Sequence, residues 1–398
     1  MSAGARADWL DLRDPAFYQS DPQEAFERLR AAEGLVRDRN GFVAMARHAD
    51  VLAAERDAEA LVSSLGYRVV HEPLEVTMIS QDDPGHLRQR RRLSPAFTPR
   101  AVGAHEAEYR ALVRDLVDAA ERELLARGEI DVIETLAAPL PCRITAELIG
   151  FGQDCWRDVK SWSERQMRLD TRDLDQRAMD EFMGSIQEWM LVMMELLPDR
   201  ASWPADDFFS RWLNPPDGQE PLGFEPMVME VGLLVAGGAE TTRTVIAHSL
   251  RTFCDHPDQW ELLYREPDRM GGAVEEMIRW VSPLNNMFRT AIRDTEINGA
   301  PIAEGERLAL LYPSANRDPT VFDGPHVFDV CREPAMHLAF GHGTHFCLGA
   351  NLARLELRLL FSELTRRFTN LRVVTEPDVE PNVFARAVRR FDLAFDRR

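Results

Sequence analysis

Phe340-Gly-His-Gly-Thr-His-Phe-Cys-Leu-Gly349 is the stretch that decides the fold of this chain of 398 residues. Gly341 and Gly343 permit tight backbone turns that residues with a Cβ rarely adopt. The leucines of residues 350–364 recur at helical spacing, so Cys347 comes just before a predicted helix N-terminus. The free N–H groups and the helix dipole at that end favour a thiolate over a thiol. The stretch therefore indicates a cysteine that is suited to bind a metal.

Two other interpretations of Cys347 compete with this one. A lone cysteine in a cytosolic protein is usually a small buried apolar side chain. Alternatively, His342, His345 and Cys347 form a set of three zinc ligands. Zinc sites usually combine two separated ligand pairs, commonly CxxC with HxxxH, and the sequence has no second pair at such a spacing. The glycines around Cys347 favour neither alternative.

The ten residues resemble the haem-binding loop of cytochrome P-450 enzymes, Phe-Gly-x-Gly-x-His-x-Cys-x-Gly, and they fill every fixed position from Phe340 to Gly349. The resemblance covers nearly the whole chain. It implies a cytochrome P-450 fold, mainly α with a minor β part, in which a single triangular domain of residues 1–398 encloses haem b. Cys347 would be the axial iron ligand, and such a thiolate favours O–O cleavage. Gly349 would let the flat haem approach the backbone, while His342 replaces the Phe or Gly more usual in the family.

A second motif lies in a long apolar helix that we expect over residues 225–253. Gly237 and Gly238 each cost about 1 kcal/mol in a helix interior. A helix tolerates them where a group approaches closely or where its hydrogen bonding is interrupted, although simple packing also explains such a pair. The run Gly237-Gly-Ala-Glu-Thr241 resembles the oxygen-activation motif of the P-450 family. The resemblance implies that the glycines make room for O2 and that Glu240 and Thr241 manage protons.

Further residues match the family at positions that would support haem. Glu276 and Arg279 lie three apart on one helical face, which on its own indicates an exposed ion pair. The resemblance implies that this pair is structural and binds a basic residue before the cysteine loop, for which Arg332 is the candidate. Four residues match family positions that bind the haem propionates, although each taken singly is a surface charge: His86, Arg90, Arg289 and His345.

The candidate substrate-facing residues rest on the resemblance and are apolar: Met78, Ile79, Leu234, Leu284, Met287 and Phe384. They favour a fairly large apolar ligand. From about residue 225 onward the chain also looks like the actinobacterial branch of the family that hydroxylates the side chains of cholesterol and cholestenone. The resemblance therefore implies a steroid- or lipid-like substrate, and tailoring of a polyketide, a macrolide or another secondary metabolite is the alternative.

Composition narrows the class of protein. With 47 basic and 66 acidic residues the net charge is −19, which argues against general nucleic-acid binding. The N-terminus has no long apolar run, so we expect neither a signal peptide nor a membrane anchor. Five scattered cysteines fit a reducing cytosol better than a disulfide framework, and we expect a cytoplasmic protein.

Arg88, Arg90, Arg91 and Arg92 form a basic cluster in this acidic chain. A charge run usually marks a solvated face. Here it also resembles the surface on which P-450 enzymes receive electrons from an acidic ferredoxin, and steering toward such a patch depends on salt.

Hydrophobic periodicity predicts the remaining elements of one domain without internal repeats. Helices are expected at 22–33, 102–127, 136–149 and 155–197 with a break near 171–175, and strands at 35–39, 41–46, 286–294, 295–302, 306–312, 371–375 and 391–395.

The resemblance implies a soluble bacterial haem-thiolate monooxygenase that inserts one atom of O2 into an unactivated C–H bond, with electrons from a ferredoxin and its reductase. The rival among enzymes is a peroxygenase that uses H2O2 directly, but such relatives usually lack the acid–threonine pair. The rival from another class is a haem-thiolate binding or sensor protein without turnover. It would need neither the proton-managing pair nor the docking cluster.

Overall fold

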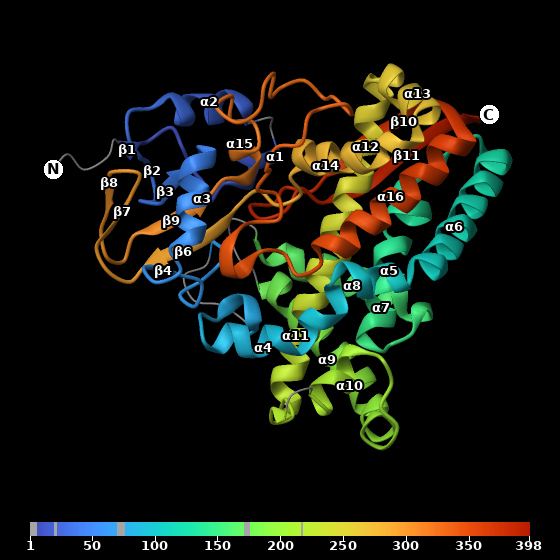
Figure 1. Ribbon diagram of the computed structural model, residues 1–398, viewed down its shortest axis with the longest axis horizontal. Helices are drawn as coiled ribbons and strands as arrows, with labels where there is room; N and C mark the ends of the chain where they lie inside the picture. Colours follow the sequence, from blue (N-terminus) through green and yellow to red (C-terminus); the bar gives the residue numbers. More distant parts are fainter. Residues whose placement is uncertain (1–5, 20–21, 70–75, 171–175, 216–217) are drawn as a thin grey trace.

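A long helical segment runs through the middle of the molecule, from α11 (Phe224–Val235) through a π-helical turn (Ala236–Glu240) into α12 (Thr241–Asp255) (Figure 1). The computed structural model describes residues 6–19, 22–69, 76–170, 176–215 and 218–398. The π-turn contains Gly237 and Gly238, where weak helix formers allow the regular hydrogen-bond pattern to change. The long helix predicted for residues 225–253 is confirmed, with an interruption at the glycines.

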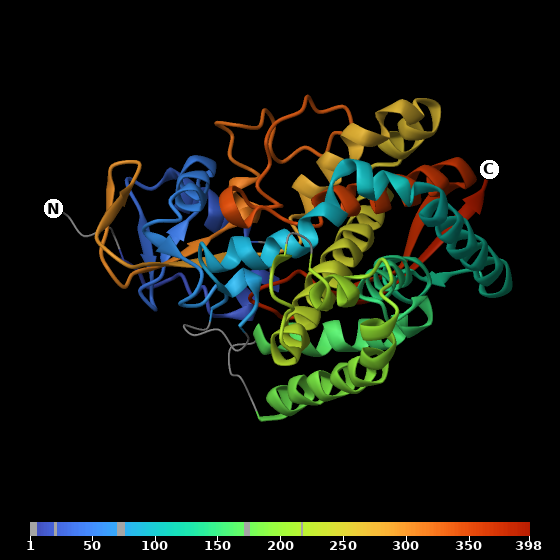
Figure 2. The ribbon, with the colours of Figure 1, turned by 60° about the horizontal axis from the view of Figure 1, so that its bottom comes forward.

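Helices make up most of the described chain, and its outline in Figure 1 is roughly triangular. Figure 2 shows α9 along one edge of the molecule. None of the helices in the described ranges combines the length and the apolar character needed to cross a bilayer. The remaining helices are α1 (Pro15–Gln19), α2 (Gln23–Ala31), α3 (His48–Arg56), α4 (Gly85–Leu93), α5 (Pro99–Ala104), α6 (Glu106–Arg127), α7 (Pro139–Ile149), α8 (Trp156–Met167), α9 (Gln176–Ser202), α10 (Phe208–Leu213), α13 (Pro257–Arg265), α14 (Met270–Val281), α15 (Tyr312–Ala315) and α16 (Ala350–Arg367).

The β part consists of small sheets, the largest of which lies at the N-terminal side of the molecule (Figure 1). Its strand order is β1-β2-β3-β9-β6-β4, and β6 pairs antiparallel with β9 through Arg289 opposite Leu308. A second sheet has the order β10-β11-β5, and β7 pairs with β8. The strands are β1 (Arg6–Ala7), β2 (Val36–Asp38), β3 (Val43–Met45), β4 (Leu61–Val62), β5 (Ile130–Asp131), β6 (Met287–Ala291), β7 (Thr295–Ile297), β8 (Ala300–Ile302), β9 (Arg307–Leu310), β10 (Phe368–Val379) and β11 (Val388–Arg397).

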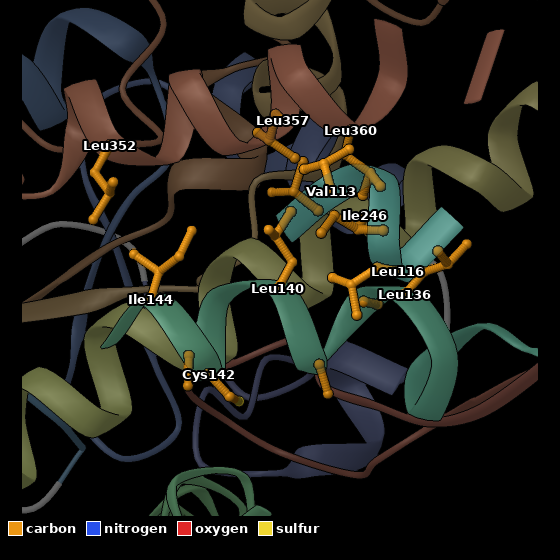
Figure 3. Close-up of a cluster of buried hydrophobic side chains, with 14 of the residues drawn as sticks. Val113, Leu116, Leu136, Leu140, Cys142, Ile144, Ile246, Leu352, Leu357 and Leu360 are labelled. Atoms are coloured by element: carbon orange, nitrogen blue, oxygen red, sulfur yellow. The ribbon is translucent and has the colours of Figure 1, made fainter. Parts of the chain in front are cut away.

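The main core holds α16, the helix that directly follows Cys347. Leu357 and Leu360 of α16 are buried with Val113 of α6, Leu140 of α7 and Ile246 of α12 (Figure 3). Burial of a leucine side chain stabilises by about 1.5–3 kcal/mol relative to exposure. Because several such residues anchor α16, the cysteine loop that precedes it leads into a helix whose N-terminus is fixed.

Most predicted elements are confirmed within a few residues, but some are divided: the strand expected over 295–302 is a hairpin of β7 and β8. The helix expected over 102–127 is divided into α5 and α6, and the one expected over 136–149 begins with a π-turn at Ile133–Ala137. The break expected near 171–175 lies outside the described residues. The helix α3 was not predicted from the sequence, and it supports the cysteine loop.

Candidate functional site

The backbone of the cysteine loop folds back on itself before α16. The Cys347 N–H donates to the Phe340 carbonyl at 2.8 Å, and the left-handed residues Gly341 and Gly343 have φ of 66° and 71°. A Cβ on Gly343 would lie 2.3 Å from the backbone oxygen of Glu55 in α3. Gly343 is therefore required both by its conformation and by the close approach of the loop to α3.

Cys347 is half-buried, and burial of its sulfur opposes the charged thiolate form unless a cation lies nearby. Burial raises the pKa of the Cys347 thiol above its ordinary value, while the Gly349 N–H and the guanidinium groups of Arg90 and Arg354 act to lower it. The prediction of a thiolate from the helix end alone thus missed the cost of burial. Coordination of a metal supplies the missing charge, since a coordinating thiol is deprotonated outright.

A cavity of about 250 Å³ lies between the cysteine loop and the π-turn of the long helix. Cys347, Phe340 and Gly349 line it from the loop, while Gly237 and Thr241 line it from the helix. Apart from chain neighbours and the backbone of its own helix, a Cβ on Gly237 or on Gly349 would meet no atom of the described residues within 4 Å. A side chain at either position would project into open space of the cavity. The glycines therefore leave that space free for a flat ligand.

The two glycines of the π-turn have different surroundings. A Cβ on Gly238 would lie 2.6 Å from Oγ1 of Thr145 in α7, whereas Gly237 has space around it. Gly238 thus permits close helix packing as well as lining the cavity. The Thr241 hydroxyl donates to the Gly237 carbonyl at 2.9 Å, so it is held at the cavity wall by the irregular turn itself.

Glu240 does not line the cavity beside Thr241. Its carboxylate is buried in a pair with Arg243, whose Nη1 also donates to Glu164 at 2.8 Å. Lys160 contacts Glu164 at 2.9 Å and the more exposed Glu134 at 2.9 Å. The acid of the motif is therefore the inner end of a chain of charged groups that reaches the surface through α8.

The four candidate propionate-binding residues all line one end of the cavity. His86 is fully buried, its Nδ1 lies 3.0 Å from Asp83, and its Nε2 has no partner among the described residues. Burial lowers the pKa of His86, and burial with nearby Arg289 lowers the pKa of His345 to about 2. Neutral imidazole and guanidinium N–H donors that face a cavity suit carboxylate groups, so this set fits the propionates of haem.

Glu55 of α3 lines the same end of the cavity and was missed from the sequence. Its Oε1 accepts from the Tyr312 hydroxyl at 2.6 Å, and burial raises the pKa of Glu55 to about 7. The neighbouring Arg56 donates to Nε2 of His342 at 3.3 Å, and the backbone of His342 bonds to Glu55. His342 therefore joins the cysteine loop to α3.

Glu276 and Arg279 form a buried pair and not an exposed one. Arg279 donates to the two Glu276 oxygens at 2.6 and 2.8 Å and to the Asn316 carbonyl at 2.9 Å. The candidate partner Arg332 donates from Nε to Glu276 at 3.0 Å, and the Asp329 N–H also donates to Glu276, at 2.9 Å. The network joins α14 to the irregular chain before the cysteine loop.

Five of the six candidate substrate-facing residues line the cavity: Met78, Ile79, Leu234, Leu284 and Met287. Phe384 is not among the lining residues. It is buried in a small cluster with Tyr67 and Ala236, beside which Ile79 and Met287 pack. Sequence reasoning missed Phe97, Leu148 and Phe208, which also line the cavity and come from segments without a motif.

The basic cluster is less exposed than predicted. Arg88 and Arg91 are exposed, but Arg90 lines the cavity and its Nη2 donates to the Phe346 carbonyl. Arg92 is buried, which corrects its assignment to a solvated face. Helical periodicity explains the division, since the four residues occupy different faces of α4.

The zinc alternative for His342, His345 and Cys347 finds no support in the described part of the chain. Within the ranges that the structure describes, no group of three or more His, Cys, Asp or Glu side chains is arranged to hold a metal ion. Cys347 therefore offers a single protein ligand. One protein ligand is enough for a metal in a prosthetic group that supplies the other donor atoms itself.

Comparison with known proteins extends these observations to the whole chain. The model of the family Cytochrome P450 matches residues 170–394. A steroid C26-monooxygenase of Mycobacterium tuberculosis (strain ATCC 25618 / H37Rv) is 37% identical over 373 residues, which cover 94% of this chain and 92% of that protein. A linalool 8-monooxygenase of Pseudomonas putida is 33% identical over 376 residues, which cover 90% of this chain and 91% of that protein. A solved Mycobacterium marinum cytochrome P450 in complex with pseudoionone has a TM-score of 0.88 and 29% identity, and 99% of this chain and 100% of that chain are covered.

Proposed function

The chain belongs to the cytochrome P450 family, and we propose that it hydroxylates a steroid or a related isoprenoid in the cavity between Cys347 and Thr241. Family membership establishes the P450 fold, a haem cofactor with a cysteine thiolate ligand, and monooxygenation of an apolar substrate. The observation that carries the proposal is that the loop of Cys347 and the π-turn of the long helix line one largely apolar cavity.

The residues of the site divide the work between holding haem and handling protons. Cys347 would be the iron ligand, and His86, Arg90, Arg289 and His345 would hold the propionates. When bound, haem supplies an iron centre at which O2 is activated and one oxygen atom is transferred to the substrate. Gly237 keeps its part of the cavity wall free of side-chain atoms.

Thr241 presents its hydroxyl at the cavity wall, where the hydroxyl donates a hydrogen bond to the Gly237 carbonyl. From this position it can transfer a proton into the cavity. Glu240 supplies the acid behind it. Because Arg243 holds the Glu240 carboxylate away from the cavity, transfer to Thr241 requires a water or a side-chain rotation. The charged chain through Glu164 and Lys160 then connects Glu240 with solvent.

Electrons come from a redox partner, and we assign an acidic ferredoxin to the exposed Arg88 and Arg91 on α4. The same helix carries His86 and Arg90 to the cavity, so the docked donor would lie near the haem edge. The whole chain is strongly acidic, with a net charge of −19, which confines attraction for an acidic partner to such patches. We also propose that residues 1–398 form a single domain and that the enzyme acts in the cytoplasm.

The substrate class rests on the cavity lining and on the relatives. The compounds named for the three relatives, a steroid, linalool and pseudoionone, are all isoprenoids. Met78, Leu234, Leu284 and Met287 give the cavity an apolar lining that suits such a compound.

A spectral titration of the ferric enzyme tests the substrate class. Cholest-4-en-3-one, linalool and a macrolide are compared for the low-spin to high-spin shift, and turnover is then measured with NADPH, a surrogate ferredoxin and its reductase. We expect the steroid to give the largest shift and a hydroxylated product. A shift with the macrolide alone would overturn the substrate class. Product from H2O2 but not from NADPH would indicate a peroxygenase, and correctly bound haem with no product from any compound would favour a sensor.

A further inference from the structure

Glu230 is a fully buried carboxyl group on α11 that lies behind the cavity wall. Its Oε1 accepts from the Met78 N–H at 2.7 Å and from Nε2 of Gln89 at 2.9 Å. Its Oε2 is buried and has no partner among the described residues. One carboxyl oxygen therefore joins three parts of the chain: α11, the turn Met78–Ser80 and α4.

The two sides joined by this carboxyl both reach the cavity. Met78 and Ile79 line it from the turn, and Leu233 and Leu234, three and four residues beyond Glu230, line it from the next turn of α11. Helical spacing places residues three and four apart on neighbouring positions of one face. The bond between Glu230 and Met78 therefore fixes one part of the substrate-facing wall to the helix that carries the other.

An acid at this place is unusual because its described partners are neutral. Burial raises the pKa of Glu230 to about 7, while the bonds from Gln89 and Met78 lower it only in part. Buried carboxyl groups without a counter-charge are costly. An acceptor oxygen is nonetheless required here, since the Met78 N–H would otherwise be buried without a partner.

We propose that Glu230 is a positioning residue that holds Met78 and Ile79 against α11 and thereby determines which bulky substrates fit beside the haem. The proposal deepens the proposed function and rests on it for the location of haem and substrate. It does not depend on the identity of the substrate, because the geometry concerns the wall and not the ligand.

Two substitutions separate the acceptor from the charge. Glu230→Gln keeps an acceptor oxygen for Met78 and removes the charge, whereas Glu230→Leu removes the acceptor at similar size. Glu225→Leu is the matched control, because Glu225 is an exposed glutamate of the same helix. Each holoenzyme is titrated with imidazole and with the bulky azole econazole, which bind the same iron but need different room, and amide hydrogen exchange is followed at residues 76–80.

We expect Glu230→Leu to weaken econazole binding about tenfold, as loss of a buried acceptor implies, while imidazole affinity changes by less than about twofold. Exchange at residues 76–80 should accelerate in the same variant. Glu230→Gln and Glu225→Leu should behave like the unsubstituted enzyme. Equal econazole affinity and equal exchange in Glu230→Leu and Glu225→Leu would overturn the proposal, as would a Glu230→Gln variant as impaired as Glu230→Leu.

A further variant keeps the test decisive if Glu230→Leu fails to retain haem. Glu230→Asp keeps the charge and shortens the reach to Met78, so it should lose econazole selectivity and exchange protection where Glu230→Gln does not. The reverse order would overturn the proposal. Azole binding needs only haem and an intact cavity wall. An enzyme that does not bind steroids but shows the expected azole and exchange results would therefore refute the substrate class and leave the role of Glu230 intact.

Discussion

Glu275 and Glu276 are adjacent glutamates on α14 that make ion pairs in opposite surroundings. Glu276 is 3% exposed and accepts bonds from Arg279 at 2.6 and 2.8 Å and from Arg332 at 3.0 Å. The side chain of Glu275 is 38% exposed and pairs with Arg354 at 2.7 and 2.9 Å and with the buried His337 at 3.2 Å; against the effect of burial, these partners lower the pKa of Glu275 to about 2. Substitution of each by glutamine keeps the shape and removes one charge, so the pair isolates the effect of burial.

The expected magnitudes differ severalfold. Removing one partner of a buried ion pair costs about 3–5 kcal/mol because the remaining charge is left uncompensated, and Glu276→Gln leaves two such guanidinium groups. An exposed pair contributes about 0–1 kcal/mol because water screens it and its side chains lose entropy. We therefore expect Glu276→Gln to lower the free energy of unfolding by about 3–5 kcal/mol and Glu275→Gln, whose ion pairs are partly screened by water, by about 1–2 kcal/mol.

Urea unfolding of both holoenzymes at pH 7, followed by far-UV circular dichroism and by the haem absorbance, measures these effects. The haem signal should be lost at lower urea in Glu276→Gln, because Glu276 holds the chain before the cysteine loop. Adding Arg332→Met to Glu276→Gln should cost less than the sum of the single changes, since the two residues share one bond. Equal losses for Glu275→Gln and Glu276→Gln would refute the reasoning.

Three further substitutions test the site. Thr241→Ala should keep haem but yield less product per NADPH and more hydrogen peroxide, and Thr241→Ser should restore the ratio; unchanged coupling would exclude the role given to the hydroxyl. Glu356 is a buried residue of α16 that lines the cavity, and burial raises its pKa to about 8 from 4.5, so its stabilising contribution is full below pH 4.5 and is lost as the pH rises through about 8. The gain in unfolding free energy from Glu356→Gln should therefore be about 3 kcal/mol larger at pH 8 than at pH 5, and a pH-independent difference would contradict this. Gly238→Ala should lower the free energy of unfolding by about 1–3 kcal/mol because its Cβ meets Thr145, and adding Thr145→Ala should recover most of the loss; a double variant as unstable as Gly238→Ala would contradict this.

The parts of the site that the sequence predicts are those in which one short segment carries both the geometry and the chemistry. The turns around Cys347 and the interruption at Gly237 follow from glycine and helix periodicity, and no distant contact is needed to recognise them. Their electrostatics were predicted less well. The pKa of Cys347 is raised by burial, which the position before α16 does not reveal.

The parts that were missed depend on tertiary contacts. Glu55 and Glu230 are single acids with no motif around them, yet each reaches a segment more than a hundred residues away. The orientation of Glu240 depends on Arg243, which belongs to the same helix but pairs with α8 as well. Arg92 was expected on a solvated face because four arginines in five residues indicate exposure, although one side of α4 packs inward.

The most direct test of the account is the visible spectrum of the reduced CO complex in Cys347→Ser, with Cys331→Ser as the control because Cys331 is exposed. The account predicts that Cys347→Ser loses the strongly red-shifted Soret band of a thiolate-ligated haem, while Cys331→Ser retains it. Persistence of that band in Cys347→Ser would mean that another residue binds the iron, and the assignment of the site would be wrong.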